Sequence, residues 1–165
     1  MTAVSIPSTF ASFTETWSPR LIAAVNDQQV KIAKIDGSFI FHAHPDSDEL
    51  FYLLAGELTL EIESESASNS EPTPKSAQST ETENADADVE VEVDVDVDVD
   101  GQPAQRKGIE AVVMRPGDVY VVPRGVRHRP VARNAQILMI ERNDTVNTGD
   151  AADRRRQKDV VDARV

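Results

Sequence analysis

The sequence has no cysteine, no long apolar run and no signal-like start. Without thiols it cannot build a disulfide framework, a zinc ribbon or a cysteine nucleophile, so any bound metal must be held by histidine and carboxylate side chains. A membrane-spanning helix needs about eighteen consecutive apolar residues, and the chain has no such stretch. The N-terminus lacks the basic segment and apolar segment of a secretory signal. We therefore expect a cytoplasmic protein with no membrane partner.

Basic residues are also scarce: 17 lysines and arginines stand against 29 aspartates and glutamates, for a net charge of −12 over 165 residues. Thirteen of the acidic residues and one lysine, Lys75, fall between Glu63 and Asp100, so this segment accounts for the whole net charge. The other 127 residues are formally neutral and suffice for one compact domain. Nucleic-acid binding needs a basic surface, and the sequence has only a short arginine cluster near its C-terminus. We expect no nucleic-acid partner.

Four parts can be distinguished along the chain. An N-terminal segment, 1–29, is expected to pack on the domain, and its apolar patch 21–25 could form a helical turn or an edge strand. Strand-like segments rich in β-branched and aromatic residues fill 30–62 and 108–142. Glycine-containing turns are expected to separate them, among them Asp36-Gly37 and Ala55-Gly56-Glu57. Short strands at regular spacing predict an all-β sandwich or barrel, followed by a polar tail, 143–165.

The remaining part, 63–107, is expected to be a disordered acidic insert, because its first half is polar and without periodicity. From Val89 to Asp100, valine alternates strictly with Asp or Glu. A low-complexity repeat in a loop explains this better than a strand, since six like charges on one face oppose strand formation. A strand extension or a weak divalent-cation surface is the alternative. The arginine cluster 154–156 is interpreted as solvated, with binding to an acidic partner or to the insert as alternatives.

The chain has only three histidines, His42, His44 and His128. His42 and His44 are two apart in a segment that resembles a strand, so both rings should project from one face. A turn after His44 can bring Glu49 back toward them, and His128 follows a Pro-x-Gly turn. Three imidazoles and one carboxylate are a ligand set suited to a divalent metal ion with open positions. The alternative for each histidine alone is an ordinary core or surface residue.

The residues around the histidines resemble two known motifs. The segment Gly37-Ser-Phe-Ile-Phe-His42-Ala-His44-Pro-Asp-Ser-Asp-Glu49-Leu-Phe-Tyr-Leu-Leu-Ala-Gly56 resembles the first cupin motif. The segment Gly117-Asp-Val-Tyr-Val-Val-Pro123-Arg-Gly125-Val-Arg-His128 resembles the second. Two departures are a first spacer that is one residue short and Ala132 in place of an asparagine that is not a ligand. The resemblance extends to small single-domain RmlC-like cupins described as mannose-6-phosphate-isomerase-like, and to fungal cupin oxidoreductases of secondary metabolism.

This resemblance implies a cupin double-stranded β-helix, or jelly-roll, barrel that carries the acidic insert in the variable loop between its two motifs. It also implies that His42, His44, Glu49 and His128 are the metal ligands. Fe(II) or Mn(II) is favoured as the divalent ion, with Zn(II) or Ni(II) as alternatives. Members of this family often form dimers, so a homodimer is expected as well.

The function implied is that of a metal-dependent oxidoreductase acting on a small aromatic or polyketide-type metabolite. Phe51 and Leu53 share the alternation of Glu49 and should line the same apolar interior. Alternatives are an isomerase or epimerase of sugar-phosphate or carbonyl substrates, for which the sequence identifies no base, and a ligand-binding cupin without catalysis. Arg127 and Arg129 could hold an anionic substrate, but alternation around an inward His128 points them outward.

Overall fold

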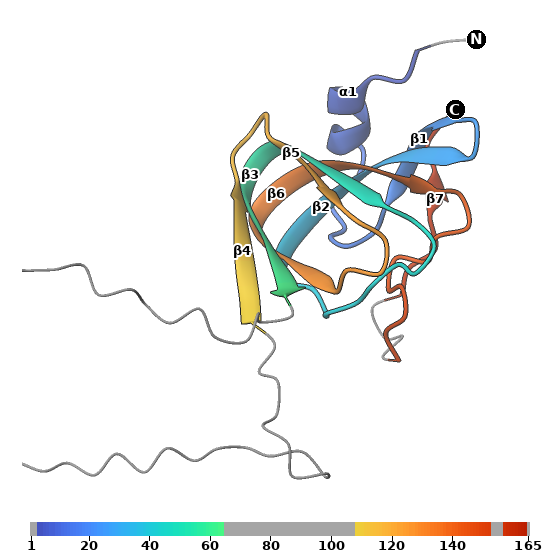
Figure 1. Cartoon of the computed structure of the whole chain (residues 1–165). Coiled ribbons are helices and arrows are strands. Elements are labelled where there is room, and N and C mark those ends of the chain that lie inside the picture. Colours follow the sequence, from blue (N-terminus) through green and yellow to red (C-terminus); the bar gives the residue numbers. More distant parts are fainter. Residues whose placement is uncertain (1–2, 65–107, 153–156, 165) are drawn as a thin grey trace, which may run out of the picture. The chain divides into compact units, whose positions relative to one another are not determined.

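The computed structural model describes residues 3–64, 108–152 and 157–164. Within these residues one short helix and seven strands follow one another along the chain (Figure 1): α1 (Ile6–Ala11), β1 (Arg20–Val25), β2 (Gln28–Ser38), β3 (Glu49–Ser64), β4 (Gly108–Met114), β5 (Val119–Val122), β6 (His128–Arg142) and β7 (Val161–Asp162). No helix in this part of the chain is long and apolar enough to cross a membrane. Nearly all of the predicted acidic insert and the arginine cluster 154–156 lie outside the described residues.

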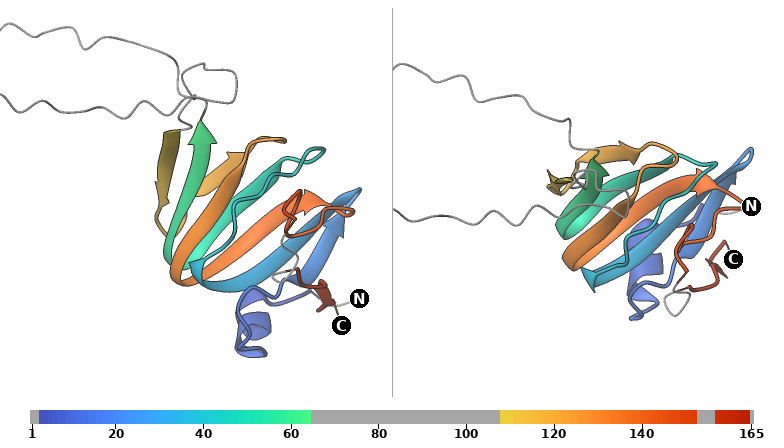
Figure 2. Two further views of the ribbon diagram at one scale, coloured as in Figure 1. Left: turned by 90° about the horizontal axis from the view of Figure 1, so that it is seen from below. Right: turned by 60° about the horizontal axis from the view of Figure 1, so that its bottom comes forward.

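All seven strands belong to one sheet with the order β4-β3-β6-β2-β1-β7, and β5 pairs with the start of β3. The two longest strands, β3 and β6, pair antiparallel over most of their length, and β6 pairs on its other side with β2. These long strands curve strongly, so that the sheet wraps around an interior (Figure 1 and Figure 2). The all-β barrel predicted from the sequence is confirmed.

Two of the predicted turns are wrong, because the strands continue through them. β2 runs through Asp36 and Gly37, and its pairing with β6 shifts register just before Gly37. β3 runs through Gly56, with two register shifts between Leu53 and Glu57. Each shift marks one extra residue in one of the two paired strands, as in a β-bulge. The extra residue is Leu54 in β3 at the first shift of that strand, whereas opposite Asp36 and opposite Gly56 it lies in β6. Glycine between two apolar runs is typical of both bulges and hairpin turns, so the pattern alone does not separate them.

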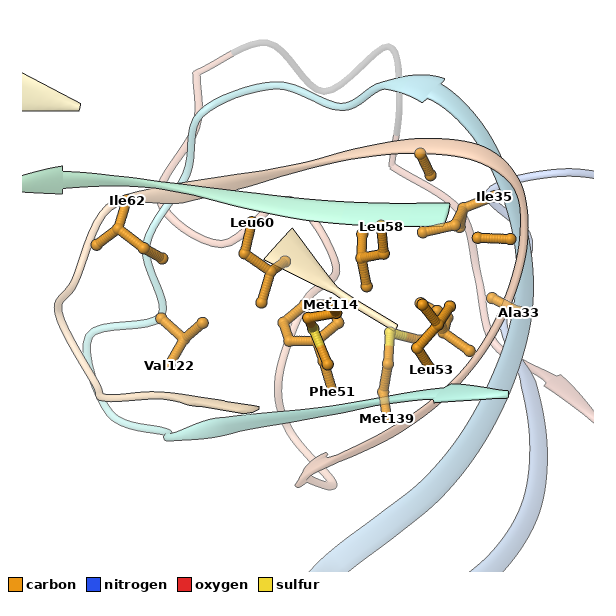
Figure 3. Packing of buried hydrophobic residues seen from close by; sticks show 13 residues of the cluster. Ala33, Ile35, Phe51, Leu53, Leu58, Leu60, Ile62, Met114, Val122 and Met139 are labelled. Atoms are coloured by element: carbon orange, nitrogen blue, oxygen red, sulfur yellow. The ribbon is translucent and has the colours of Figure 1, made fainter. Parts of the chain in front are cut away.

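The bend in β3 brings two rows of its own apolar side chains face to face. Phe51 and Leu53 precede the bend, Leu58 and Leu60 follow it, and all four are at most 2% exposed. Figure 3 shows the two pairs pointing toward each other across the interior. The inward orientation predicted for Phe51 and Leu53 is confirmed. The core also contains Ala33, Ile35, Ile62, Met114, Val122, Ala132, Ala135, Ile137 and Met139.

The N-terminal segment packs on the outer face of this sheet (Figure 2). α1 begins after Ser5, whose hydroxyl accepts a hydrogen bond from a backbone N–H of the first turn, and a proline occupies that turn. This serine and proline are the local signal that would have predicted the helix. Phe10 and Phe13 pack with Ile22 and Ile32 in a second apolar cluster. Residues 20–25 form a strand rather than a helical turn, and β7 pairs with it in parallel.

Candidate metal centre

The four candidate ligands come from three parts of the chain. His42 and His44 lie in the loop 39–48 between β2 and β3, whereas Glu49 begins β3 and His128 begins β6. The prediction that both histidines of the loop belong to a strand is wrong, since only His42 forms a β-bridge, with His128. The backbone N–H of His42 donates to the carbonyl of His128 at 3.0 Å, and the N–H of His128 donates to the carbonyl of His42 at 2.9 Å. β6 begins only at His128, and the next backbone hydrogen bond, from the N–H of Gly125 to the carbonyl of His44 at 2.9 Å, comes from the turn before β6 and not from a strand.

The side chains of these four residues converge. All four are buried, and one potential ligand atom from each lies within 4.8 Å of those of the others. The Oε2 atom of Glu49 is 3.1 Å from Nε2 of His128 and 3.3 Å from Nε2 of His44. The ring of His42 lies 4.5 Å from that of His128 and 4.9 Å from that of His44, between centroids. The spacing is therefore that of three nitrogen donors and one oxygen donor around a common point.

Two of the rings are oriented by their backbone. Nδ1 of His42 is 3.0 Å from the carbonyl oxygen of Ile40, and Nδ1 of His128 is 3.0 Å from that of Val126. A carbonyl only accepts, so each Nδ1 carries the proton of its ring and donates it. This leaves Nε2 of both rings for the interior of the cluster, where Nε2 of His128 lies 3.1 Å from Oε2 of Glu49. Such an anchor on the far ring nitrogen is the usual arrangement behind a metal-binding histidine.

Burial and mutual contact set the protonation of the cluster. Burial lowers the pKa of His42 to about 4, and the neighbouring His128 adds to this effect. Burial also acts to lower the pKa of His44, but the carboxylate of Glu49 outweighs it and raises that pKa above its ordinary value. Burial alone would raise the pKa of Glu49, yet His128 and His44 hold it well below its ordinary range. At neutral pH the cluster thus contains an ionised carboxylate and a neutral His42, the forms that bind metal.

The donor set fits a divalent transition-metal ion. Nε2 of His44 is buried and makes no hydrogen bond within the described part of the chain, although it faces Glu49. A buried nitrogen without a hydrogen bond, beside two other imidazoles and a carboxylate, fits a position at which a cation would bind. Imidazole and carboxylate together suit iron, manganese, nickel and zinc. These four residues are therefore the group that could hold the ion.

A segment after β6 supports the loop that carries two of the ligands. The Oδ1 atom of Asp150 accepts a hydrogen bond from the N–H of Ala43 at 2.8 Å, and the N–H of Asp150 donates to the carbonyl of Ala43 at 3.0 Å. Gly149 lies so close that a Cβ there would be 2.1 Å from that carbonyl oxygen. Arg127 forms an ion pair with Asp150 at 3.1 Å. The sequence contained no signal for this clamp, because its partners are more than a hundred residues apart.

The two arginines beside His128 do not enter the site. Arg127 forms ion pairs with Glu63 and Asp150, and Arg129 pairs with Glu61 at 2.6 Å. Both arginine side chains remain about one third exposed. Their outward orientation, predicted from alternation around His128, is confirmed.

A cavity of about 40 Å³ adjoins the candidate ligands His42 and Glu49. Most of its lining is apolar or aromatic: Trp17, Pro19, Ala33, Ile35, Phe39, Phe51, Pro130, Ile137 and Met139. Its other polar lining residues are Glu141 and Asn147. A cavity that binds benzene has a volume of about 150 Å³, so this one encloses only a functional group and a few neighbouring atoms of a ligand.

A buried ion pair of Lys31 and Glu141, at this cavity, was not predicted from the sequence. Nζ of Lys31 lies 2.8 Å from Oε1 of Glu141, and the two residues are 1% and 2% exposed. Burial and the nearby Glu49 raise the pKa of Glu141 to about 7, while Lys31 and His44 act in the opposite direction. The available signal was alternation in β6, where the buried positions Ile137 and Met139 are followed by Glu141 at the next inward position.

Solved structures with a similar fold include two with informative descriptions. A cupin-2 domain containing protein from Shewanella frigidimarina superposes with a TM-score of 0.52 and 26% identity, over 84% of this chain and 91% of that one. The hydroquinone 1,2-dioxygenase PnpCD, solved with Fe3+, gives a TM-score of 0.54 with 17% identity over 90% of this chain. The match spans only 34% of the dioxygenase chain, so it shows the fold alone.

At the level of sequence, a curated relative is an uncharacterised protein of Bacillus subtilis, YdbB. It is 50% identical over 40 residues, which are 24% of this chain and 35% of the relative. A family model described as Cupin matches residues 8–156, which includes both histidine motifs and most of the chain. The expected jelly-roll fold is thereby confirmed, and the chain belongs to the cupin family.

Proposed function

We propose that this cupin is a metal-dependent oxidoreductase that acts on a small organic metabolite, with an aromatic or polyketide-type compound as the favoured class. The observation that carries the proposal is the buried group of His42, His44, Glu49 and His128 beside a largely apolar cavity. These four residues would hold Fe(II) or Mn(II), and the bound ion would supply redox chemistry with dioxygen. Zn(II) undergoes no redox change, so an oxidoreductase favours iron or manganese over it.

The protein's own residues contribute orientation and exclusion of water. The backbone carbonyls of Ile40 and Val126 hold the rings of His42 and His128 by Nδ1, so that Nε2 of each ring would be available to bind the ion. Trp17 and Phe39 stack at 4.9 Å, and Phe39 contacts His42 edge-on, so aromatic side chains shield this side of the cluster. A substrate would present its reacting end to the cavity and keep its larger part at the mouth, because the enclosed volume is small.

Metal analysis of two ligand variants tests the proposal. Protein purified without added metal should contain close to one equivalent of Fe or Mn by elemental analysis, and His42→Ala and His128→Ala should lose it. Arg133→Ala, which removes an exposed ion pair with Glu57, is the matched control and should keep the metal. An oxygen electrode then screens aromatic substrates with the loaded protein. Metal content that is unchanged in both histidine variants would overturn the proposal.

An isomerase or epimerase acting on a carbonyl substrate is a second candidate, because Glu141 is a carboxylate that could move a proton. Among the described residues no lysine or arginine lines the cavity, which favours an uncharged carbonyl compound over a sugar phosphate. Oxygen uptake separates these reactions, since only the oxidoreductase consumes dioxygen. A loaded protein that binds ligands without turning them over would instead be a ligand-binding cupin.

We also propose a homodimer that buries the exposed apolar side chains of β4 and β5. Ile109, Val113, Val119 and Val121 are each between 46% and 72% exposed, and β4 is the terminal strand of the sheet order. A second copy of the same surface would cover these side chains by apolar contact. Sedimentation velocity should find a dimer for the wild type and a monomer for Val113→Lys. A monomeric wild type at 50 to 100 μM, on the order of the concentrations at which weak dimers form, would contradict this.

A further inference from the structure

The buried ion pair of Lys31 and Glu141 is more than a structural contact between β2 and β6. Lys31 and Glu141 lie on neighbouring paired strands, where Gln29 is opposite Glu141 and Met139 is opposite Lys31. Both side chains are therefore diagonal neighbours on the inward face. A pair of this kind is weak support for stability, since apolar residues of similar volume often do as well or better. Its presence in the core needs another reason.

Only half of the Glu141 carboxylate is used within the described part of the chain. Its Oε1 atom accepts from Lys31, whereas its Oε2 atom is buried and has no hydrogen-bond partner there. A buried carboxylate oxygen without a donor is unfavourable, and such atoms are rare unless something else binds them. The unpartnered oxygen belongs to a residue that lines the cavity beside His42 and Glu49.

The other polar groups of the cavity lining are already engaged. His42 and Glu49 belong to the candidate metal centre, Nε1 of Trp17 donates to the carbonyl of Asp36 at 2.9 Å, and Asn147 also has an interaction partner. We propose that Oε2 of Glu141 is the substrate-recognition atom of this cavity and accepts a hydrogen bond from a hydroxyl group of the ligand. This inference rests on the proposed function.

The charges around the cavity select a neutral hydroxyl over other groups. The free oxygen of Glu141 belongs to an anionic carboxylate whose cation, Lys31, already pairs with the other oxygen, so a carboxylate or phosphate of the ligand beside this oxygen would be repelled. An ammonium group would be repelled by a divalent ion at the candidate centre. A hydroxyl donates one hydrogen bond without net charge, and its size matches the small enclosed volume.

Protonation would turn one oxygen of Glu141 into a donor, so the experiment is done at a pH at which the carboxylate is ionised and both oxygens only accept. Burial and Glu49 place its pKa at about 7, against the opposing effects of Lys31 and His44. At pH 8 the carboxylate is ionised and both of its oxygens accept. Binding is therefore compared at pH 8, where phenol, used as the probe, is still neutral.

The experiment measures the preference of the site for phenol over anisole, which is the same ring with its hydroxyl methylated. Trp17 is the only tryptophan of the chain and lines the cavity, so its fluorescence reports occupancy. We expect zinc-loaded full-length protein to bind phenol at least tenfold more tightly than anisole. In Glu141→Gln the amide oxygen must face Lys31, because an ammonium group only donates, and the amide NH2 then replaces the free acceptor. The preference should fall to about twofold or less.

Two further variants separate recognition from folding. Glu61→Gln changes a carboxylate that pairs with Arg129 away from the cavity, and it should keep the full preference for phenol. The double variant Lys31→Met with Glu141→Leu replaces the ion pair by apolar residues; it should fold, bind zinc and show no preference. An unchanged preference in either folded Glu141 variant would overturn the proposal, as would wild-type protein that binds both probes equally or neither up to 10 mM.

Zinc content, measured on the same samples, tests the metal site separately. A protein that takes up no zinc contradicts the proposed metal dependence, and the phenol preference of that protein still decides the role of Glu141.

Discussion

Single side chains of the candidate centre are arranged by short contacts to the backbone and to one another. His42 and His128 are oriented by carbonyl acceptors, whereas Nε2 of His44 lies 3.3 Å from Oε2 of Glu49. This difference appears in their protonation, since the pKa of His42 falls to about 4 and that of His44 rises. His44 is therefore the candidate ligand at which we expect a proton to compete most strongly with a metal ion.

We expect zinc affinity to increase with pH across the range 5.5 to 8. Metal binding must displace the proton that Glu49 stabilises on His44, and this cost disappears once the pH exceeds the raised pKa of His44. His42 is already neutral over this range and should contribute nothing to the slope. Competition with a chromogenic chelator at each pH measures the affinity.

Glu49→Gln is the control for this pH dependence. It removes the charge that raises the pKa of His44, so the rise in affinity should move to lower pH. The affinity itself should also fall, by more than the about 10–100-fold lost when a group behind a metal ligand is removed. If zinc affinity rises over the same pH range in the wild type and the variant, His44 does not titrate as described.

At the scale of elements, two devices position the site: bulges that bend the long strands, and a segment after β6 that clamps the ligand loop. The bulge at Gly56 turns β3 so that its second half faces the first across the core. The clamp joins Asp150 to both backbone groups of Ala43, between the two loop histidines. Neither device touches the metal position, and each can be tested by one substitution with a matched control.

Gly56→Ala should destabilise the barrel strongly. Gly56 has φ of +83°, and a Cβ there would lie 2.3 Å from the carbonyl oxygen of Asn134 and 2.6 Å from Cα of Ala135. Gly117→Ala is the control, because Gly117 also has positive φ, +101°, but has open space where the Cβ would be. We expect Gly117→Ala to cost about 1–2 kcal/mol and Gly56→Ala clearly more. Thermal unfolding measures the loss of stability in both variants. Equal losses would contradict the prediction, because β6 would then move away from the new Cβ with no cost in free energy.

Asp150→Ala should weaken metal binding more than it weakens the fold. It removes the hydrogen bond to the N–H of Ala43 and the ion pair with Arg127, so the ligand loop loses its anchor. We expect metal affinity to fall by about 10–100-fold. Asp144→Ala, which removes an exposed ion pair with Arg142, is the control and should bind metal normally. If both variants bind metal like the wild type, the clamp does not position His42 and His44.

On the scale of the whole molecule, charge and chemistry are separated along the chain. The segment from Glu63 to Asp100, nearly all of it between β3 and β4, carries a net charge of −12, whereas the candidate centre and its cavity are built from the rest of the chain, which is formally neutral when taken together. A connection between two strands tolerates large changes in length, because closure entropy changes by only about 0.6 kcal/mol for each doubling. The folding of the barrel and its binding of metal should therefore not depend on the length of this connection.

Replacing residues 65–107 by an eight-residue Gly-Ser linker tests this independence. We expect unchanged metal content and a free energy of unfolding higher by about 1–2 kcal/mol, since the shorter loop loses less entropy on closure. Chemical denaturation and elemental analysis provide the two readouts. Loss of metal or of the folded state would show that this part of the chain belongs to the functional unit.

The sequence by itself determined the all-β fold, the resemblance to cupins and the identity of the four candidate ligands, because these depend on local alternation and on motif spacing. Only the tertiary structure decided that Asp36-Gly37 and Gly56 lie in bulges, that Asp150 holds the ligand loop, and that Glu141 lines the cavity with a free oxygen. The physical reason is distance along the chain. Lys31 and Glu141 are separated by 110 positions, and Ala43 and Asp150 by 107, so the pairing of β2 with β6 and the path of the chain after β6 are needed to bring them together.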